Sequence, residues 1–255
     1  MSQLDRSHEQ IRARDGTTVL ELAACSDKGP VRRDNQDAWA IRPLARRGAV
    51  VVLADGMGGH ADGAIASHLA VTAATERLVA DPDPGRALGE AVEEANQAIA
   101  ERRRERRVLS GTTLVVAVVR DGRAVLANIG DSRAYLIRAG LARQVTQDHS
   151  WLADEMRAGR IPVASAAHDQ RRNVLSRALT GDSVQADVFE LELAGGDTLV
   201  LCCDGIWEAL DDDALAALLA PGRPLADEVA EAVATAIRQG STDNATVVAC
   251  RLAGG

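Results

Sequence analysis

Two segments of this 255-residue chain have the same order, an apolar run that ends in Asp-Gly. They are residues 50–56 (VVVLADG) and residues 199–205 (LVLCCDG). Four or more consecutive apolar residues predict a strand that is covered on both faces. Such a strand brings its carboxylate, Asp55 or Asp204, to the rim of the core, where loss of water is costly. The glycine that follows lets the backbone turn sharply and leaves its own carbonyl accessible.

Two further carboxylates have similar settings. Asp37 ends the polar sequence Asn-Gln-Asp, and Asp243 lies just before the strand pattern at residues 245–249. If the four carboxylates converge, each pair about 4 Å apart costs on the order of 4 kcal/mol at an effective dielectric of about 20. A divalent cation turns this repulsion into binding energy, and oxygen ligands without His or Cys favour Mg²⁺ or Mn²⁺ over zinc. The pattern predicts a hydrolase that uses a hard metal.

The composition argues against several other classes of protein. The net charge is −8, and no stretch combines dense Lys and Arg with aromatic residues, so a nucleic-acid surface is not expected. The basic run at residues 102–107 is interpreted as the solvated last turn of a helix, where it complements the helix dipole, rather than as a binding patch. No apolar run approaches the roughly 20 residues of a membrane helix, and the polar N-terminus is not a signal peptide.

The four cysteines lie in or beside apolar strand patterns: Cys25, Cys202, Cys203 and Cys250. Their spacing fits neither a zinc site nor a redox pair. We therefore expect reduced, buried thiols in a cytoplasmic protein.

Strand and helix patterns occur in blocks along the chain rather than as strict strand–helix–strand units. Strand patterns occupy residues 19–25, 38–41, 49–54, 112–119, 124–129, 134–137, 184–193, 198–203 and 245–252. Helix patterns occupy about residues 60–80, 85–107, 149–159, 212–220 and 224–239. In the first helix pattern, Ile65, Leu69 and Ala73 share one face. Short connections with Gly, Asp or Asn favour antiparallel pairing. The chain is therefore predicted to be an α+β protein, with two packed antiparallel β-sheets flanked by helix pairs (an αββα sandwich).

The chain is predicted to form one domain, because no linker rich in Pro, Gly or Ser divides it. Residues 1–17 are expected to be a polar, poorly ordered N-terminal tail, and residues 18–255 the domain. Between about 150 and 183 the patterns weaken. A segment this long with little core character is functional or disordered.

One local pattern points to a different class of protein. Residues 56–61 (GMGGHA) follow a strand pattern and match the dinucleotide-binding fingerprint G-x-G-x-x-A. A true fingerprint is followed about 20 residues later by a strand with an acidic end, but residues 73–78 (AATERL) continue the helix pattern. Asp55 also lies where a pyrophosphate would approach. A Rossmann site is therefore rejected.

A set of short segments occurs in an order that is typical of one enzyme family. The segments are residues 26–32 (SDKGPVR), 35–37 (NQD), 54–60 (ADGMGGH), 110–113 (SGTT), 130–133 (GDSR), 148–150 (DHS), 172–175 (RNVL), 203–207 (CDGIW) and 240–244 (GSTDN). Each alone is weak, whereas the ordered set, which spans about residues 20–252, is specific. The chain resembles the metal-dependent serine/threonine protein phosphatases (the PPM family, protein phosphatase 2C type), and the bacterial members in particular.

The resemblance implies a two-metal centre at one end of the sandwich. By position in the motifs, Asp55 bridges the two metals and Gly56 lends its carbonyl to one of them. Asp37, Asp204 and Asp243 complete the other. The expected ions are Mn²⁺ or Mg²⁺.

Two further site residues follow from the resemblance. On composition alone, residues 130–133 are either a hairpin corner or a metal site; the resemblance assigns Asp131, with Asp204, to a third, weaker metal site. Arg32 matches the residue that holds the substrate phosphate, and its planar guanidinium donates two parallel hydrogen bonds to phosphate oxygens. The weakly patterned segment at about 150–183 matches the family's variable flap.

The implied activity is hydrolysis of phosphoserine and phosphothreonine in proteins by a metal-activated water, without a covalent intermediate. The expected partners are phosphoproteins, including a bacterial Ser/Thr kinase that the enzyme opposes and the targets of that kinase. The alternative is a catalytically inactive pseudophosphatase that binds phosphoproteins. Such proteins typically lose metal ligands, whereas the four carboxylates and Arg32 are all present here.

The residue after the first Asp-Gly departs from many eukaryotic relatives, which have a His there that is proposed to protonate the leaving group. Here that residue is Met57, as is common in bacterial members. His60 is either a substitute proton donor or a partly exposed residue in the first turn of a helix. The identity of the general acid therefore stays open.

Overall fold

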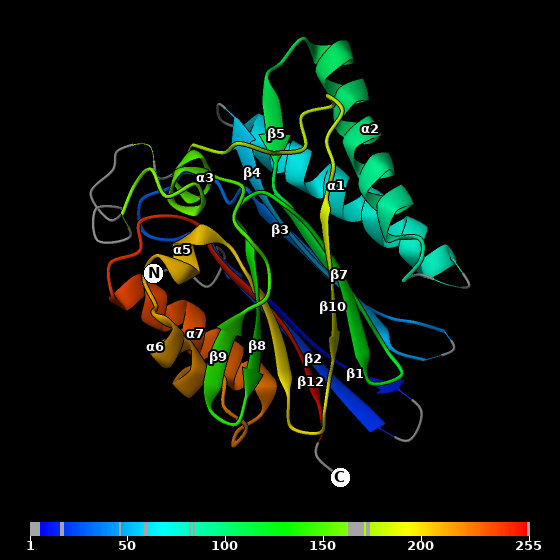
Figure 1. Ribbon diagram of the computed structural model, residues 1–255, viewed down its shortest axis with the longest axis vertical. Coiled ribbons are helices and arrows are strands. Elements are labelled where there is room, and N and C mark those ends of the chain that lie inside the picture. The colour runs from blue at the N-terminus through cyan, green and yellow to red at the C-terminus, as the bar shows by residue number, and fades with distance from the viewer. Residues whose placement is uncertain are drawn as a thin grey trace.

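Two antiparallel sheets lie face to face in the computed structural model, which describes residues 6–15, 18–45, 47–58, 61–81, 83, 85–162, 171 and 174–253 (Figure 1). In spatial order, the first sheet contains β1 (Arg6–Asp15), β2 (Thr18–Asp27), β12 (Ala245–Leu252), β11 (Thr198–Cys202), β8 (Arg133–Arg138) and β9 (Leu141–Gln144). The second contains β10 (Asp187–Glu192), β7 (Arg123–Ile129), β6 (Leu114–Arg120), β4 (Ala49–Gly58) and β3 (Asp37–Pro43), and the short β5 (Ser110–Thr112) pairs with the end of β4.

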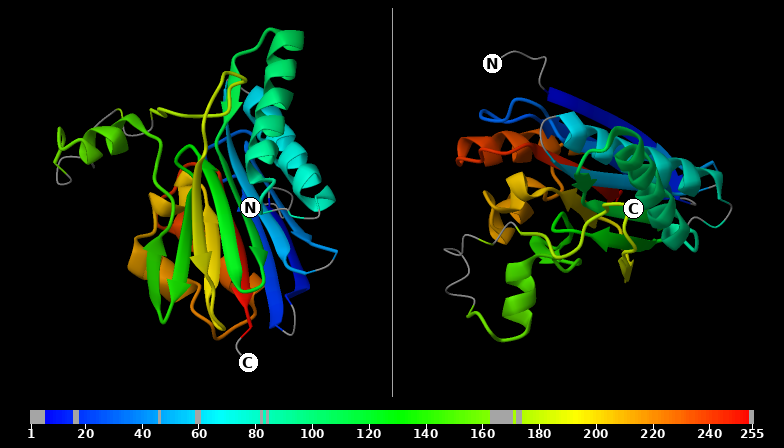
Figure 2. Two further views of the ribbon diagram at one scale, coloured as in Figure 1. Left: turned by 45° about the vertical axis from the view of Figure 1, so that its right-hand side comes forward. Right: turned by 90° about the horizontal axis from the view of Figure 1, so that it is seen from above.

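Helices cover the outer faces of both sheets. Among the described residues the helices are α1 (Ala61–Ala80), α2 (Leu88–Arg106), α3 (Trp151–Arg157), α5 (Asp204–Trp207), α6 (Asp212–Leu218) and α7 (Leu225–Arg238). Figure 1 shows α1 and α2 on the second sheet and α6 and α7 on the first, while Figure 2 shows α3 standing out from the sandwich. The predicted αββα architecture is confirmed. None of the described helices is long and apolar enough to cross a membrane.

The apolar run of β4 is buried on both faces, as its sequence predicts. Val51 and Leu53 point into the core between the sheets, whereas Val50 and Val52 pack under the two helices on the outer face. The chain has only five aromatic residues. Interleaved Ala, Val, Leu and Ile side chains therefore fill both layers, and the strand that carries Asp55 is held rigidly between them.

Helix α1 packs on its sheet with a face that differs from the predicted one. Its buried residues include Ala66, Ala70 and Ala74. Ile65 and Leu69 are only partly buried. The actual contact face is thus offset by one residue from the stripe of larger side chains. Alanines let the helix axis approach the sheet closely, which the count of large apolar residues does not reveal.

The prediction of a tail at residues 1–17 is wrong where the structure describes that segment. Residues 6–15 form β1, which pairs along its whole length with β2 at the edge of the first sheet. Ala13 is buried and Ile11 packs against the core, but arginines alternate with them. An edge strand is held by backbone hydrogen bonds and needs few apolar residues, so its sequence reads as a polar tail.

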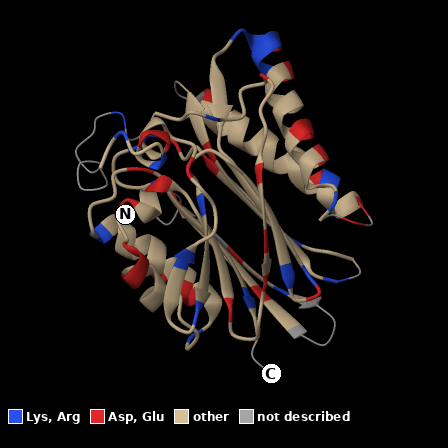
Figure 3. Ribbon diagram, in the orientation of Figure 1, with Lys and Arg blue, Asp and Glu red and all other residues tan. Residues whose placement is uncertain are grey.

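The basic run at residues 102–107 ends α2, as predicted. Arg103, Arg104 and Arg106 occupy the last turn, and Figure 3 shows them as a basic tip on that helix. All four cysteines are free and buried, as the prediction of buried thiols requires.

Candidate metal centre

The register of β3 and β4 places Asp37 directly opposite Asp55. Asp37 is 4% exposed, and its Oδ2 accepts a hydrogen bond from the Thr246 hydroxyl at 2.5 Å. Its Oδ1 is buried and has no hydrogen-bond partner among the described residues. A buried carboxylate oxygen left unpaired is costly, so this atom is suited to a cation.

The backbone of Asp55 is fixed on both sides by two threonines. Its N–H donates to the Thr113 hydroxyl at 2.9 Å. Its carbonyl accepts from the Thr112 hydroxyl at 2.8 Å and from the Thr113 N–H at 2.9 Å. The half-buried carboxylate of Asp55 therefore projects from a peptide unit that has little freedom to move.

The chain does not turn at Gly56, contrary to the prediction from its sequence. β4 continues through Gly56 to Gly58 and pairs there with β5. A Cβ on Gly56 would lie 2.2 Å from the carbonyl oxygen of Gly63 and 2.7 Å from that of Gln36. Glycine is therefore needed for the close approach of two neighbouring segments rather than for a turn.

The second Asp-Gly lies at a junction between strand and helix. β11 ends at Cys202, and Asp204 is the first residue of the short helix α5. Oδ1 of Asp204 is buried without a hydrogen-bond partner in the described part of the chain. A Cβ on Gly205 would lie 2.0 Å from the carbonyl oxygen of Asn244, so this glycine also permits a close approach.

Asn244 ties the loop at residues 28–36, which carries the predicted phosphate ligand, to the start of β12. Its side-chain nitrogen donates to the carbonyls of Lys28 at 2.8 Å and Asp34 at 3.1 Å. Its side-chain oxygen accepts from the N–H of Gln36 at 2.8 Å. The buried amide thus has partners at both ends and fixes the loop against the site.

Arg32 reaches the candidate centre from that loop. Its Nη2 donates to Oδ2 of Asp243 at 2.5 Å. The side chains of Arg32 and Asp243 are 54% and 31% exposed, so this pair lies at the mouth of the site rather than in the core. The predicted phosphate ligand, Arg32, therefore lies next to the predicted metal ligand Asp243.

Asp131 lies in the turn between β7 and β8 and is held from two sides. The indole N–H of Trp207, in α5, donates to the Asp131 carbonyl at 3.0 Å. The N–H of Gly130 donates to Nδ1 of the buried His149 at 3.1 Å. Because Trp207 shares a helix with Asp204, these contacts bring the predicted third site to the second Asp-Gly.

The pKa values indicate that the predicted aspartates lie close together. Burial raises the pKa of Asp37 and of Asp131 to about 6 in each case. Burial also raises the pKa of Asp55 well above its usual range, and the charges of Asp37, Asp204, Asp131 and Asp243 raise it further. The pKa of Asp204 is likewise raised well above its usual range by burial and then by Asp131 and Asp243. The site stores electrostatic repulsion that a cation relieves.

The donor chemistry of this centre fits divalent metals of the hard type. It offers oxygen ligands only, two of them buried and unpaired. Within the described ranges, no three His, Cys, Asp or Glu side chains already surround one point as a finished cluster. Carboxylates gathered at one end of both sheets are the kind of ligand set that a metal-dependent hydrolase uses.

Several supporting residues were assigned no role from the sequence. Thr246 is the one polar residue in the otherwise apolar segment 245–250 (ATVVAC), and a polar residue inside a buried strand is the signal that would have found it. Thr112, Thr113 and Asn244 fall within the family motifs but carry no separate signal. His60 lies outside the described residues.

Comparison with known proteins identifies the family. The sequence model of protein phosphatase 2C matches residues 32–240. The serine/threonine phosphatase Stp of Listeria innocua is 32% identical over 232 residues, which cover 88% of this chain and 92% of that protein. The serine/threonine protein phosphatase PstP of Mycobacterium tuberculosis is 37% identical over 239 residues, covering 91% of this chain and 45% of PstP.

Solved structures agree with this match. Stp1 from Staphylococcus aureus superimposes with a TM-score of 0.87 at 29% identity, covering 96% of this chain and 100% of that one. The catalytic domain of PstP, solved in complex with two manganese ions, gives a TM-score of 0.82 at 34% identity. The match covers 93% of this chain and 100% of that one. The chain belongs to the protein phosphatase 2C family. The predicted enzyme class, a metal-dependent serine/threonine protein phosphatase, is confirmed.

Proposed function

We propose that Asp37, Asp55, Gly56, Asp204 and Asp243 bind two divalent cations, Mn²⁺ or Mg²⁺, with Asp55 between them. The observation that supports this best is the mutual effect of the aspartates, whose burial and charges raise the pKa of Asp55 and Asp204. Such a cluster is stable with ionised carboxylates only when a cation compensates their charge.

Asp131 is the candidate ligand of a third, weaker ion shared with Asp204. Its raised pKa, about 6, and the contact of Trp207 with its carbonyl support this assignment. The side chain is 7% exposed. A weaker site is expected because Asp131 contributes one carboxylate beside ligands that the first two ions already use.

The residues of the chain set up hydrolysis without a protein nucleophile. When bound, two divalent cations supply Lewis-acid activation of water and neutralise the phosphoryl charge. Asp55 keeps its position because Thr112 and Thr113 hold its backbone. Burial raises the pKa of the Cys202 thiol to about 12 and that of Cys203 well above its usual range, so neither provides a thiolate.

Arg32 is proposed to hold the substrate phosphate. A guanidinium has five N–H donors, and the contact with Asp243 involves one nitrogen. Arg32 can therefore bind phosphate oxygens while it stays beside Asp243. Arg32→Ala is expected to raise KM by roughly tenfold or more, since a hydrogen bond to a charged group contributes about 1.5–3 kcal/mol. Arg33→Ala, at the exposed neighbouring arginine, is the matched control, and an unchanged KM for Arg32→Ala contradicts the assignment.

The cellular role proposed for this phosphatase is to oppose a bacterial Ser/Thr kinase by acting on the kinase and its targets. A cytoplasmic location stays a prediction from the sequence. The similarity to bacterial serine/threonine phosphatases supports the kinase assignment. Phosphoproteomics of the parent cell against a strain without this protein tests it, because phosphosites of one kinase should accumulate together.

The alternative function is a pseudophosphatase that binds phosphoproteins without turnover. Hydrolysis of p-nitrophenyl phosphate by the pure protein separates the two. We expect activity with Mn²⁺ and its loss with EDTA. If no metal-dependent hydrolysis is measured with a folded protein, the enzyme assignment fails and the binding module is favoured.

A further inference from the structure

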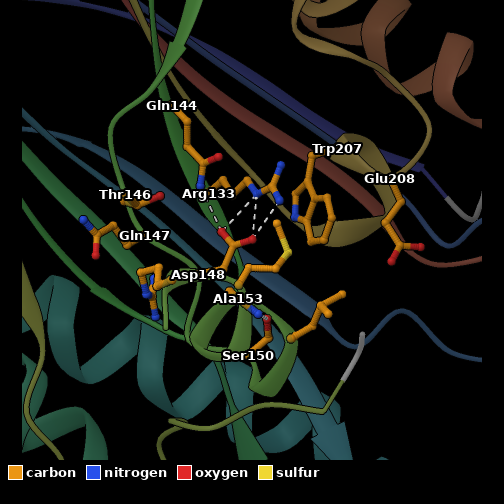
Figure 4. A pocket seen from close by; sticks show the side chains of 12 residues that line it. Arg133, Gln144, Thr146, Gln147, Asp148, Ser150, Ala153, Trp207 and Glu208 are labelled. Atoms are coloured by element: carbon orange, nitrogen blue, oxygen red, sulfur yellow. Dashed lines mark hydrogen bonds and ion pairs between the residues drawn. The ribbon is translucent and has the colours of Figure 1, made fainter. Parts of the chain in front are cut away.

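A pocket of about 780 Å³ lies next to the candidate metal centre, between α3, α5 and the edge of the first sheet (Figure 4). Trp207 belongs to both places. Its indole ring lines the pocket, while its N–H donates to the Asp131 carbonyl at 3.0 Å. We call this space the α3 pocket. It is therefore separated from the candidate third metal ligand by a single aromatic side chain.

The charged groups of the pocket wall are paired with one another. Arg133 donates through Nε to Oδ1 of Asp148 at 3.0 Å and through Nη2 to Oδ2 at 2.7 Å. Its Nη1 donates to the hydroxyl of Tyr135 at 2.9 Å. Asp148 also accepts from Nε2 of Gln144 at 2.9 Å. Each nitrogen of the guanidinium thus has a partner, and this wall has little capacity to select a charged ligand.

Arg133 also restricts the movement of the Trp207 ring, which forms the aromatic part of the pocket wall. The guanidinium carbon of Arg133 lies 3.6 Å from the centroid of the Trp207 ring. This cation–π contact and the hydrogen bond to Asp131 fix both the plane and the edge of the indole. Figure 4 shows Arg133 between Asp148 and Trp207. The ring is therefore held in a fixed orientation at the pocket wall.

The apolar side chains of α3 form another part of the pocket wall, together with its polar residue Arg157 and the N-cap residue Ser150. Leu152, Ala153 and Met156 line the pocket, with Leu152 and Met156 about one helical turn apart. Met156 is partly exposed, and methionine adapts its shape to different ligands. Two of the lining residues, Arg157 and Glu208, carry opposite charges. With the charges of the other wall paired, burial of apolar surface is the main source of binding energy.

We propose that the α3 pocket binds an uncharged, bulky side chain of the phosphoprotein substrate, such as Leu, Met or Phe, close in sequence to the phosphoamino acid. This inference depends on the proposed function, which places the phosphate at the metal centre. An extended chain advances roughly 3.3 Å per residue. We therefore expect the side chain that enters the pocket to lie within about three positions of the phosphoamino acid.

A segment of the substrate is the expected occupant because the pocket is continuous with the candidate centre through Trp207. Because Trp207 borders both places, residues next to a phosphoamino acid bound at the centre are expected to lie near the pocket. The pocket is then a specificity-determining site for the sequence around the phosphorylated residue.

The test uses phosphothreonine peptides that differ at one position, with Ala, Leu, Phe, Lys or Glu placed in turn at each of the three positions on either side. The measurement is kcat/KM from phosphate release. At one position we expect Leu or Phe to exceed Ala by roughly tenfold, as is usual for a hydrophobic pocket. Lys and Glu should give no gain.

Two variants assign that preference to the pocket. Met156→Ala removes part of the apolar wall, and Ala153→Phe fills the space from the same helix. Each should reduce the Phe-to-Ala ratio of kcat/KM to about one to threefold. Leu141→Ala, at a leucine that is 69% exposed and does not line the pocket, is the matched control and should keep the full ratio. Melting temperatures check that the variants fold.

A second readout separates this inference from the proposed function. The dissociation constants of phosphonate peptides, which are not hydrolysed, should show the same Phe-to-Ala preference by calorimetry. Failure to hydrolyse p-nitrophenyl phosphate would overturn the proposed activity only. Equal values for all peptides in the native protein, or a preference that survives in both Met156→Ala and Ala153→Phe, would overturn the pocket assignment.

Discussion

The two Asp-Gly steps have the same sequence but reach the candidate metal centre along different backbone routes. Asp55-Gly56 lies inside β4, which continues to Gly58 and is flanked there by β5. Asp204-Gly205 lies where β11 has ended and α5 begins. One step therefore presents its carboxylate from a strand, and the other from the first turn of a helix.

What the two steps share is the crowding around their glycines. In each case a foreign carbonyl oxygen occupies the place of a Cβ, from Gly63 at 2.2 Å and from Asn244 at 2.0 Å. The glycine therefore lets a second segment pack against the backbone next to the aspartate. In the first step that segment begins α1, and in the second it is Asn244, which lies between Asp243 and the start of β12. The repeated dipeptide marks close approach of two chain segments, and the turn is incidental.

The largest expected difference between the steps is catalytic. Asp55→Asn should lower kcat/KM on the order of a thousandfold, which corresponds to a loss of about 4 kcal/mol of transition-state stabilisation. The reason is that Asp55 is proposed to contact both ions. Asp204→Asn should lose activity mainly through weaker metal binding. Titration of each variant with Mn²⁺ up to millimolar concentration checks this. Activity should return in part for Asp204→Asn but not for Asp55→Asn, and equal recovery of both would contradict the bridging role.

A stability comparison addresses the glycines. Gly56→Ala and Gly205→Ala should each destabilise the protein by about 2–3 kcal/mol, since each new methyl meets a backbone carbonyl that cannot move cheaply. Gly89→Ala is the matched control in α2, where nothing lies within 4 Å of the added Cβ. It should stabilise by about 0.5–1 kcal/mol, as alanine does in a helix. Urea unfolding measures all three, and a neutral result at Gly56 or Gly205 would refute the crowding explanation.

The sequence predicts the carboxylates better than it predicts the path of the backbone around them. Apolar runs identify β4 and β11 because burial on both faces leaves a strong signal. The absence of a turn at Gly56 could not be predicted, since it depends on Gly63, seven residues further on, and on β5. These contacts are long-range, and a local pattern does not contain them.

Two other features show the same limit. The strand β1 is held by backbone pairing, so its side chains carry little apolar signal. The α3 pocket joins Arg133, Asp148 and Trp207 from three separate segments, and its charges are paired only in the folded chain. Family motifs cover all three residues, but a motif gives no geometry. The candidate residues could therefore be named from the sequence, whereas their supporting contacts could not.

The pH dependence of metal-free and metal-bound protein should differ. The pKa of Asp37, opposite Asp55, is raised from 3.8 to about 6 mainly by burial. The folded protein then binds more protons than the unfolded chain between these values, so the metal-free protein loses stability as the pH rises from about 4 to 6. This change amounts to roughly 3 kcal/mol. Mn²⁺ needs the ionised carboxylate, so its affinity should rise over the same range.

Thermal unfolding at a series of pH values, with EDTA and with Mn²⁺, checks that prediction. The gap between the two melting temperatures should widen as the pH increases through about 6. Asp37→Asn keeps an acceptor for Thr246 but cannot ionise, so it should make the metal-free curve less steep, while Asp131 still contributes to the slope. A gap that stays constant from pH 5 to 8 would mean that Asp37 and Asp131 do not titrate in this range.

The smallest expected effect concerns Thr246. It lies in β12 of the first sheet and contacts Asp37, which is paired with Asp55 in the second sheet. Its hydroxyl donates to Asp37 Oδ2 at 2.5 Å, so it favours the ionised form of Asp37, the form that binds a cation. Thr246→Val should weaken Mn²⁺ binding several-fold and destabilise the protein by about 1 kcal/mol. Thr75→Val is the matched control, because the Thr75 hydroxyl is buried without a hydrogen-bond partner among the described residues and has nothing to lose. Calorimetric titration with Mn²⁺ measures both variants. Equal affinities would show that Asp37 is positioned by the fold alone, whereas a loss confined to Thr246→Val makes this hydroxyl part of the metal centre.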